Sequence, residues 1–179
     1  MMKVIETRLP DVKVIEPRVF NDERGFFYES FQSSRYMQIL EMTKPFVQSN
    51  ISQSKYGVLR GLHFQHPKPQ GKLISVTRGH IFDVAVDLRL DSENYGQWVG
   101  VELSEENKRQ IWIPEGFAHG FLTLSSIADV EYKCTDYYSP QHEASLQWND
   151  PEIGIIWPIN DPILSMKDQC GVQLKDLTL

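Results

Sequence analysis

Residues 72–88, KLISVTRGHIFDVAVDL, indicate the fold class of this chain. Two runs rich in apolar and β-branched side chains, Lys72–Arg78 and Ile81–Leu88, lie on either side of the turn signal Arg78-Gly79-His80. β-Branched residues favour strands, and a short connection that contains glycine is typical of a β-hairpin. We therefore predict two strands joined by a tight hairpin.

Similar runs recur along the chain between closely spaced glycines and prolines. Seven short strands with such punctuation predict an all-β sandwich or barrel. One helix is expected over about Ser34–Met42, after a serine that can cap its free N–H groups. The predicted strands are Val58–Gln65, Lys72–Arg78, Ile81–Leu88, Gln97–Leu103, Arg109–Ile113, His119–Thr123 and Asp129–Cys134.

The length of 179 residues is that of one domain, and we expect a single domain over residues 1–179. Hydrophobic residues make up 41% of the chain and charged residues 23%, which is typical of a globular protein. The segment Asp150–Leu179 is rich in Pro and Ile, so we expect it to form a covering flap, with one helical turn near Lys167.

The net charge of −6 argues against an extended basic face for nucleic acid or for an anionic membrane. A membrane span needs about 18 to 20 apolar residues and is not found, nor is an apolar signal core, so we expect a cytoplasmic protein. Unpaired sheet edges predict a homodimer. Cys134 and Cys170 form no CxxC motif, which predicts two reduced structural thiols.

Acidic residues are missing between Glu41 and Asp83. That window contains six Lys and Arg residues and is therefore +6, whereas the rest of the chain sums to −12. Such a segment can form a local surface for an anionic ligand. A chance gap with solvated lysines explains the charge pattern as well.

The densest group of chemically active residues is RGLHFQH, Arg60–His66, followed by Lys72. A metal held by one strand needs ligands at i and i+2, because side chains alternate between faces. His63 and His66 are three residues apart, and no carboxylate follows within the acid-free window. We therefore expect no metal site here, which argues against a metal-dependent cupin oxygenase.

His63 has two interpretations. It can be a core histidine that the backbone satisfies, or a general base that the cationic Arg60 and Lys72 keep neutral near pH 7. Arg60 and His63 also differ by three, so a regular strand cannot direct both into one pocket. We predict a bulge or bend at Gly61 that brings them together.

Five further residues could carry chemistry or only packing. His119 begins a predicted strand, and Tyr132 shares a face with Val130 and Cys134, where a phenol is either a buried core group or an acid. Tyr138 lies in an aromatic loop that can stack on a flat ring or simply pack. Lys167 and Asp168 place a cation beside a carboxylate, which a helix-start cap also explains.

Several segments together resemble the dTDP-4-dehydrorhamnose 3,5-epimerase family from about residue 4 to residue 168. The resemblance implies a dimeric, cofactor-free, cupin-like jelly-roll β-barrel. The implied reaction inverts C3 and C5 of dTDP-4-dehydro-6-deoxy-D-glucose to give dTDP-4-dehydro-L-rhamnose. The matching segments are Arg24–Glu29, Gln48–Asn50, Arg60–Gln65, Gly71-Lys72, Val84–Arg89, Ile113–Phe121 and Tyr132-Lys133.

The resemblance also implies roles for individual residues. His63 matches the base, Asp168 its carboxylate partner, Tyr132 the proton donor on the opposite face of the sugar, and Lys72 the group beside the carbonyl. It implies a strand over Lys3–Ile15 that crosses to the partner. Residues that match nucleotide-sugar ligands are Arg24, Glu29, Gln48, Asn50, Arg60, His119, Glu143 and Lys167, with Tyr138 stacked on thymine.

This chemistry agrees with the residues at hand. C3 and C5 flank the C4 ketone, so loss of either proton gives an enolate, which needs a base, an acid and an oxyanion partner. Three alternatives stay open. The chain can be an epimerase that acts at C3 or C5 alone, a 3,4-ketoisomerase, or a nucleotide-sugar binder without activity.

Overall fold

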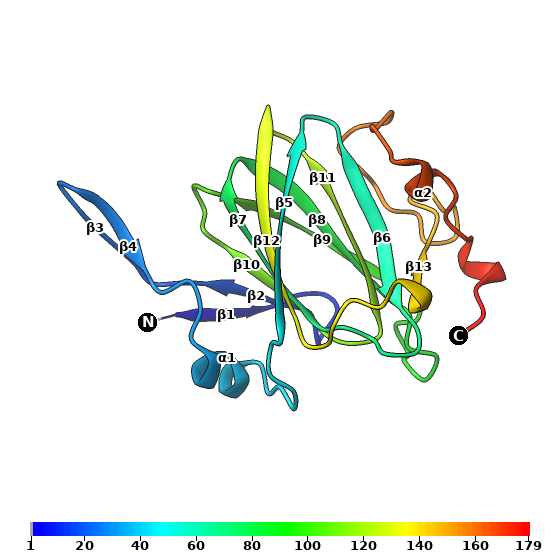
Figure 1. The fold of residues 1–179 in the computed structure, drawn as a ribbon, viewed down its shortest axis with the longest axis horizontal. Helices are drawn as coiled ribbons and strands as arrows, with labels where there is room; N and C mark the ends of the chain where they lie inside the picture. Colours follow the sequence, from blue (N-terminus) through cyan, green and yellow to red (C-terminus); the bar gives the residue numbers. More distant parts are fainter. Residues whose placement is uncertain (1) are drawn as a thin grey trace.

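The computed structural model describes residues 2–179 and contains two facing antiparallel sheets (Figure 1). The larger sheet has the spatial order β1 (Lys3–Glu6), β2 (Lys13–Glu16), β10 (Gln110–Ile113), β7 (Lys72–Arg78), β12 (Ile127–Cys134) and β5 (Gln48–Lys55). The smaller sheet has the order β13 (Glu143–Ser145), β6 (Leu59–Gln65), β11 (Phe117–Thr123), β8 (His80–Asp87) and β9 (Trp98–Ser104). This architecture confirms the predicted all-β class.

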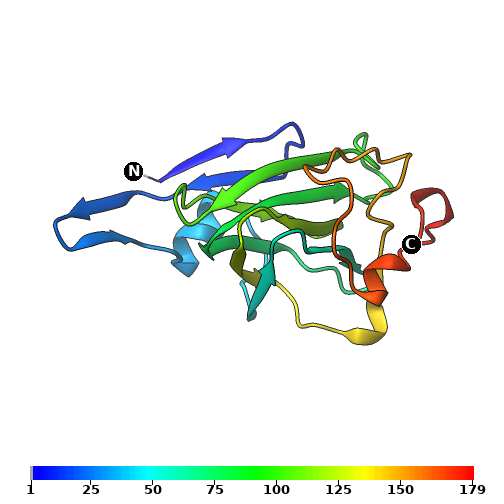
Figure 2. The same cartoon turned by 90° about the horizontal axis from the view of Figure 1, so that it is seen from above.

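Smaller elements lie around the two sheets. A hairpin of β3 (Val19–Asp22) and β4 (Gly25–Tyr28) projects from the body, as both views show (Figure 1 and Figure 2). The helices are short: α1 (Ser33–Ile39), η1 (Pro140–His142), α2 (Met166–Gln169) and η2 (Leu174–Asp176). The turn α2 confirms the helical turn expected near Lys167. No helix within residues 2–179 is long and apolar enough to cross a membrane.

Strand β8 shows how the core is built. Ile81 and Ala85 point into the cluster between the two sheets, whereas Val84 and Val86 point into a second cluster on the other face of the smaller sheet. Residues of the C-terminal segment, including Ile153 and Trp157, complete this second cluster. Because β8 is buried on both faces, apolar residues occupy consecutive positions in it instead of alternating with polar ones, and Asp83 and Asp87 are buried as well.

The turn at Gly79 is not the hairpin that we predicted. β7 pairs with β10 and β12 in the larger sheet, whereas β8 pairs with β9 and β11 in the smaller one. Gly79 has a φ of +81°, and a Cβ there would lie 2.1 Å from the carbonyl oxygen of Ile127. The glycine therefore allows a sharp corner that carries the chain from one sheet to the other.

The N-terminal third differs most from expectation. The resemblance implied one strand over Lys3–Ile15, but β1 and β2 are two strands that pair with each other within this chain. The helix α1 begins earlier than predicted, and the side chain of Gln32, not a serine, caps it by accepting from the backbone N–H of Arg35. The sequence also did not predict the strands β3, β4 and β5 in this region, or β13 farther along the chain.

Both cysteines are free, Cys134 buried and Cys170 exposed, so only Cys134 is placed as a structural thiol.

Candidate active site

A cavity of about 360 Å³ lies between the two sheets, with lining residues from β5, β7 and β12 on one side and from β6 and β11 on the other. Ten of the thirteen residues selected from the sequence line it. The lining residues are Gln48, Asn50, Ser52, Arg60, His63, Gln70, Lys72, His119, Phe121, Tyr132, Cys134, Tyr138, Glu143 and Lys167. The acid-free window supplies half of these residues, but only two of its six cations, Arg60 and Lys72, are among them.

Asp168 stands behind His63. Its Oδ1 lies 2.6 Å from Nε2 of His63, and 4% of the Asp168 side chain is exposed, compared with 29% of the His63 side chain. Burial opposes ionisation of Asp168, but hydrogen bonds from His63 and Ser165 outweigh it, so the pKa of Asp168 is lowered. The ionised carboxylate can therefore orient the imidazole and stabilise its protonated form.

A bulge at Gly61 brings Arg60 and His63 to one pocket, as predicted. Across β6 and β11, His63 pairs with His119 and Arg60 with Phe121, so three steps on β6 face two on β11. Gly61 has a φ of +130°, and a Cβ there would lie 2.5 Å from the Cα of Gly120. Only glycine fits this close approach of two backbones.

His119 forms a second pair with a carboxylate. Its Nε2 lies 2.8 Å from Oδ2 of Asp83, which is fully buried. Burial is the largest influence on both groups: it raises the pKa of Asp83 and lowers the pKa of His119, although each partner opposes the shift in the other. This pair therefore favours its neutral forms.

Cross-strand register explains the other wall of the pocket. Cys134 of β12 pairs with Lys72 of β7 and with Gln48 of β5, and Tyr132 pairs with Asn50. Tyr132 and Cys134 both line the cavity, and Tyr132 packs on the core cluster that contains Val130, so the predicted shared face is confirmed. Burial raises the pKa of Tyr132 and lowers that of Lys72. The phenol is thus held in the protonated form that an acid needs.

Glu143 joins two residues at the pocket. Its Oε2 accepts a hydrogen bond of 2.7 Å from the Tyr138 hydroxyl, and its Oε1 forms an ion pair with Lys167. Burial opposes ionisation of Glu143, but these two contacts prevail and lower its pKa. Tyr138 itself is 51% exposed, so its ring is accessible to a ligand.

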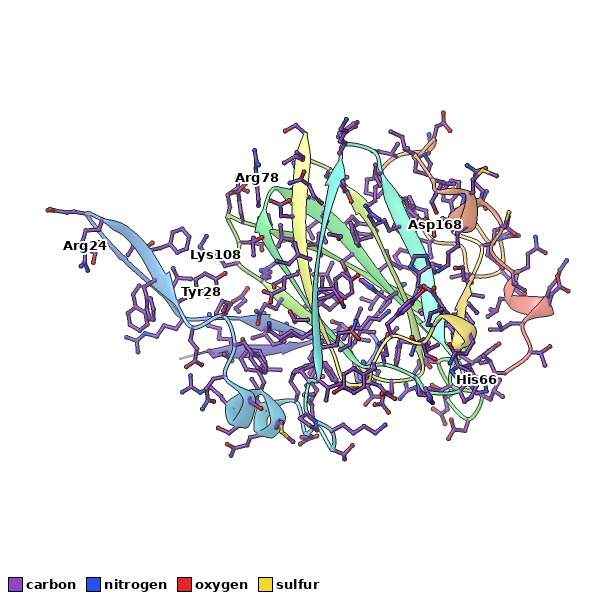
Figure 3. All side chains as sticks on the ribbon, in the orientation of Figure 1. Arg24, Tyr28, His66, Arg78, Lys108 and Asp168 are labelled. Carbon is purple, nitrogen blue, oxygen red and sulfur yellow. The ribbon has the colours of Figure 1, made fainter. Side chains whose placement is uncertain are left out.

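Arg24 and Glu29 do not lie in the cavity of their own chain. Arg24 lies at the tip of the projecting hairpin, remote from Asp168 (Figure 3), and pairs with Asp22. Glu29 pairs with Arg35, with 2.5 Å between Oε1 and Nη1. Neither residue lines the cavity that contains His63 within a single chain, because the hairpin extends away from the sheets.

Sequence reasoning missed four lining residues, namely Ser52, Gln70, Phe121 and Cys134. Cys134 was predicted to share the face of Tyr132 but was interpreted only as a structural thiol. Ser52 shares strand parity with Asn50, which would have shown it once β5 was known to pair with β12. His66 does not line the cavity with His63, and within residues 2–179 no group of three or more His, Cys, Asp or Glu side chains has the arrangement of a metal site.

Comparison with known proteins decides the family. The family model described as dTDP-4-dehydrorhamnose 3,5-epimerase matches residues 6–176. This chain belongs to that family. A dTDP-4-dehydrorhamnose 3,5-epimerase of Salmonella typhimurium is 57% identical over 100% of this chain and 99% of its own length.

Two solved structures illustrate how similar this chain is to double and single epimerases. A 3,5-epimerase from Legionella pneumophila, in complex with dTDP-4-keto-L-rhamnose, has a TM-score of 0.97 and 55% identity over 99% of this chain and 95% of its own. A 3'-monoepimerase from Streptomyces bikiniensis, in complex with dTDP-quinovose, has a TM-score of 0.88 and 30% identity over 95% and 87%. The chain is thus more similar to the double epimerase than to the single one. The family also supports the cupin-like jelly roll that the resemblance implied.

Proposed function

We propose that this epimerase converts dTDP-4-dehydro-6-deoxy-D-glucose into dTDP-4-dehydro-L-rhamnose by inverting C3 and C5. The observation that supports this most is the arrangement of His63 and Tyr132 in one cavity, on opposite sheets, with Lys72 beside Tyr132's strand. A base and an acid on opposite walls can remove a proton from one face of a sugar and return one to the other.

In the proposed reaction, His63 takes the proton from C3 or C5, and the electron pair of the C–H bond moves into an enolate on the C4 oxygen. Lys72 donates a hydrogen bond to that oxygen, for which a typical oxyanion donor contributes about 10²- to 10³-fold. Tyr132 then gives its proton to the same carbon from the opposite face. Proton exchange with solvent returns His63 and Tyr132 to their starting forms. Since the ketone itself accepts the electron pair, the reaction needs no metal or other cofactor.

Asp168 keeps the proton of neutral His63 on Nε2, which leaves Nδ1 as the basic nitrogen. Arg60 is held by Ser54 and by the carbonyl of Gln53, with 2.9 Å from its Nε to Ser54 Oγ, and we propose that it binds the diphosphate. Tyr138 stacks on the thymine. Gln48, Asn50, His119, Glu143 and Lys167 are the remaining proposed ligands of the nucleotide sugar.

We also propose that Arg24 and Glu29 serve the pocket of a second copy in a homodimer. The hairpin that carries Arg24 ends away from its own sheets and exposes 59% of Phe26 and 71% of Phe27. Exposed aromatic residues on a projecting arm are typical of an interface. Residues 1–179 then act as one domain, in the cytoplasm.

The decisive experiment is incubation with dTDP-4-dehydro-6-deoxy-D-glucose in D₂O, with and without a chelator, followed by NMR of the product. Deuterium at both C3 and C5 is the expected result, and the chelator should not change the rate. Label at one carbon would assign a single-site epimerase, and binding without label would assign a nucleotide-sugar binder. Strong inhibition by the chelator would contradict the metal-free reaction.

The homodimer has its own test. The variants Arg24→Ala and His63→Ala, each of which should be impaired alone, are mixed in the unfolded state and refolded together. If Arg24 acts in the partner's pocket, a mixed dimer regains one site with both residues intact and about a quarter to a half of the wild-type activity. No recovery on mixing would place Arg24 outside the partner's site.

A further inference from the structure

We propose that Ser165 is a positioning residue of the catalytic pair, which holds Asp168 in the orientation that His63 requires. This inference rests on the proposed role of His63 as the base. It concerns a residue that neither contacts the cavity nor belongs to the motifs of the active site.

The hydroxyl of Ser165 forms two contacts with the same residue. Its Oγ donates to Oδ2 of Asp168 at 2.7 Å and accepts from the backbone N–H of Asp168 at 3.2 Å. These two bonds close a small ring that joins the Asp168 side chain to its own backbone. The carboxylate then cannot rotate freely, and Oδ1 stays directed at Nε2 of His63.

The surroundings explain why such a contact is needed. Asp168 is carried by α2, a four-residue helix in a C-terminal segment that contributes no strand to either sheet. The nearest backbone anchors are Ile163, which bridges to Val58, and Val172, which bridges to Leu146. The loop between these anchors forms no strand pairing of its own. The side chain of Ser165 therefore restrains the conformation of Asp168, which strand pairing would otherwise restrain.

The donors around Asp168 complete the argument. The carboxylate accepts from His63 on Oδ1 and from Ser165 on Oδ2. Loss of the Ser165 hydroxyl leaves a buried carboxylate oxygen with one donor fewer. The carboxylate is then free to turn, so the His63 ring loses its fixed partner.

The test compares Ser165→Ala and Ser165→Gly with Ser165→Thr, which keeps the hydroxyl. Glycine is a tolerated N-cap, so Ser165→Gly separates the loss of the hydroxyl from a failure to fold. Ser126→Ala removes an exposed serine for which no side-chain contact is found among the described residues, and serves as the matched control. Three quantities are measured: kcat and KM against pH, the melting temperature, and the tautomer of His63 by ¹⁵N NMR.

We expect kcat of the Ala and Gly variants to fall about tenfold, the scale of a hydrogen bond to a charged group, with KM unchanged. The acid limb of kcat/KM should move to lower pH, because an imidazolium that has lost its fixed carboxylate partner holds its proton less tightly. The NMR spectrum should change from one His63 tautomer to a mixture. Ser165→Thr should restore all three properties.

A lower melting temperature with an unchanged acid limb and tautomer would show that Ser165 is only a helix cap, and would overturn the proposal. So would wild-type kinetics in Ser165→Gly. The NMR measurement needs no turnover. If the wild-type protein fails to exchange deuterium, the proposed function fails, while the tautomer comparison still decides whether Ser165 orients the pair.

Discussion

Two histidines face each other across one step of the β6–β11 ladder, and each is bonded to an aspartate. His63 is partly exposed in the pocket, and its partner Asp168 comes from the C-terminal segment with donors on both oxygens. His119 is 8% exposed, and its partner Asp83 comes from the adjacent strand β8 with Oδ1 unpaired in the described part of the chain.

The different surroundings favour the ionised carboxylate in the His63–Asp168 pair and the neutral forms in the His119–Asp83 pair. Donors keep Asp168 ionised, so it can stabilise a positive charge that appears on His63 during the reaction. Burial favours the neutral forms of Asp83 and His119, so this pair is suited to a fixed hydrogen bond in the wall of the pocket. We therefore assign proton transfer to the first pair and a supporting position to the second.

The largest expected effect is on catalysis. His63→Asn should lower kcat by about 10²- to 10⁴-fold, equivalent to about 3 to 5 kcal/mol in the barrier, because the general base is removed. Deuterium exchange should be lost at C3 and at C5 together. His119→Asn should cost less than tenfold in kcat and act mainly through KM. Equal losses of kcat in the two variants would remove the distinction between the pairs.

The bulge that positions His63 provides the next effect. Gly61→Ala places a methyl group 2.5 Å from the Cα of Gly120 at a φ of +130°, so it should lower the free energy of unfolding by about 3 to 4 kcal/mol and impair exchange.

Gly25→Ala is a matched control for this substitution. Gly25 has a nearly identical φ of +128° but nothing within 4 Å of a Cβ, so it should show the backbone strain alone, about 1 to 2 kcal/mol. Urea denaturation measures both variants. Equal losses would mean that the approach of β6 and β11 tolerates a side chain.

Substitution of Asp168 should mainly lower activity, whereas substitution of Asp83 should mainly lower stability. Asp168→Asn should lower kcat by about 10- to 100-fold, since an amide cannot stabilise the imidazolium, and should lower stability by less than Asp83→Asn. Asp83→Asn leaves buried polar atoms unpaired and should cost about 1 to 3 kcal/mol of unfolding free energy. Kinetics and urea denaturation of both variants measure the contrast. A large kinetic loss in Asp83→Asn without a loss of stability would reverse our assignment.

The sequence predicted the parts of this comparison that follow from strand parity. The three-residue spacing of Arg60 and His63 requires a bulge, and the bulge is found at Gly61. Parity also placed Tyr132 and Cys134 on one face. The pairing of His63 with Asp168 came from family resemblance, because 105 residues separate them and no local pattern joins them.

Other features depend on contacts that a local pattern does not contain. The turn residues at Gly79 predict a sharp bend but not which sheet the next strand joins. Strand β5, QSNISQSK, was missed because its pocket face carries polar side chains where a core strand would have apolar ones. Arg24 matches a ligand-binding motif, yet its hairpin directs it away from its own cavity.

The smallest expected effect is a difference in pH dependence between the two aspartate variants. The folded-state pKa of Asp168 is lowered, so its contribution to stability is present above about pH 4, its unfolded value, and disappears as the pH falls through the folded value. The stability deficit of Asp168→Asn should therefore shrink on acidification. Asp83 has a raised pKa, so its ionisation destabilises the wild-type fold as the pH rises above about 4. The stability deficit of Asp83→Asn should therefore shrink as the pH rises. Urea denaturation of both variants and the wild type at several pH values between about 2.5 and 7 measures the two slopes. Slopes of the same sign would mean that the two pairs hold their charges alike, and that exposure to the pocket alone distinguishes His63 from His119.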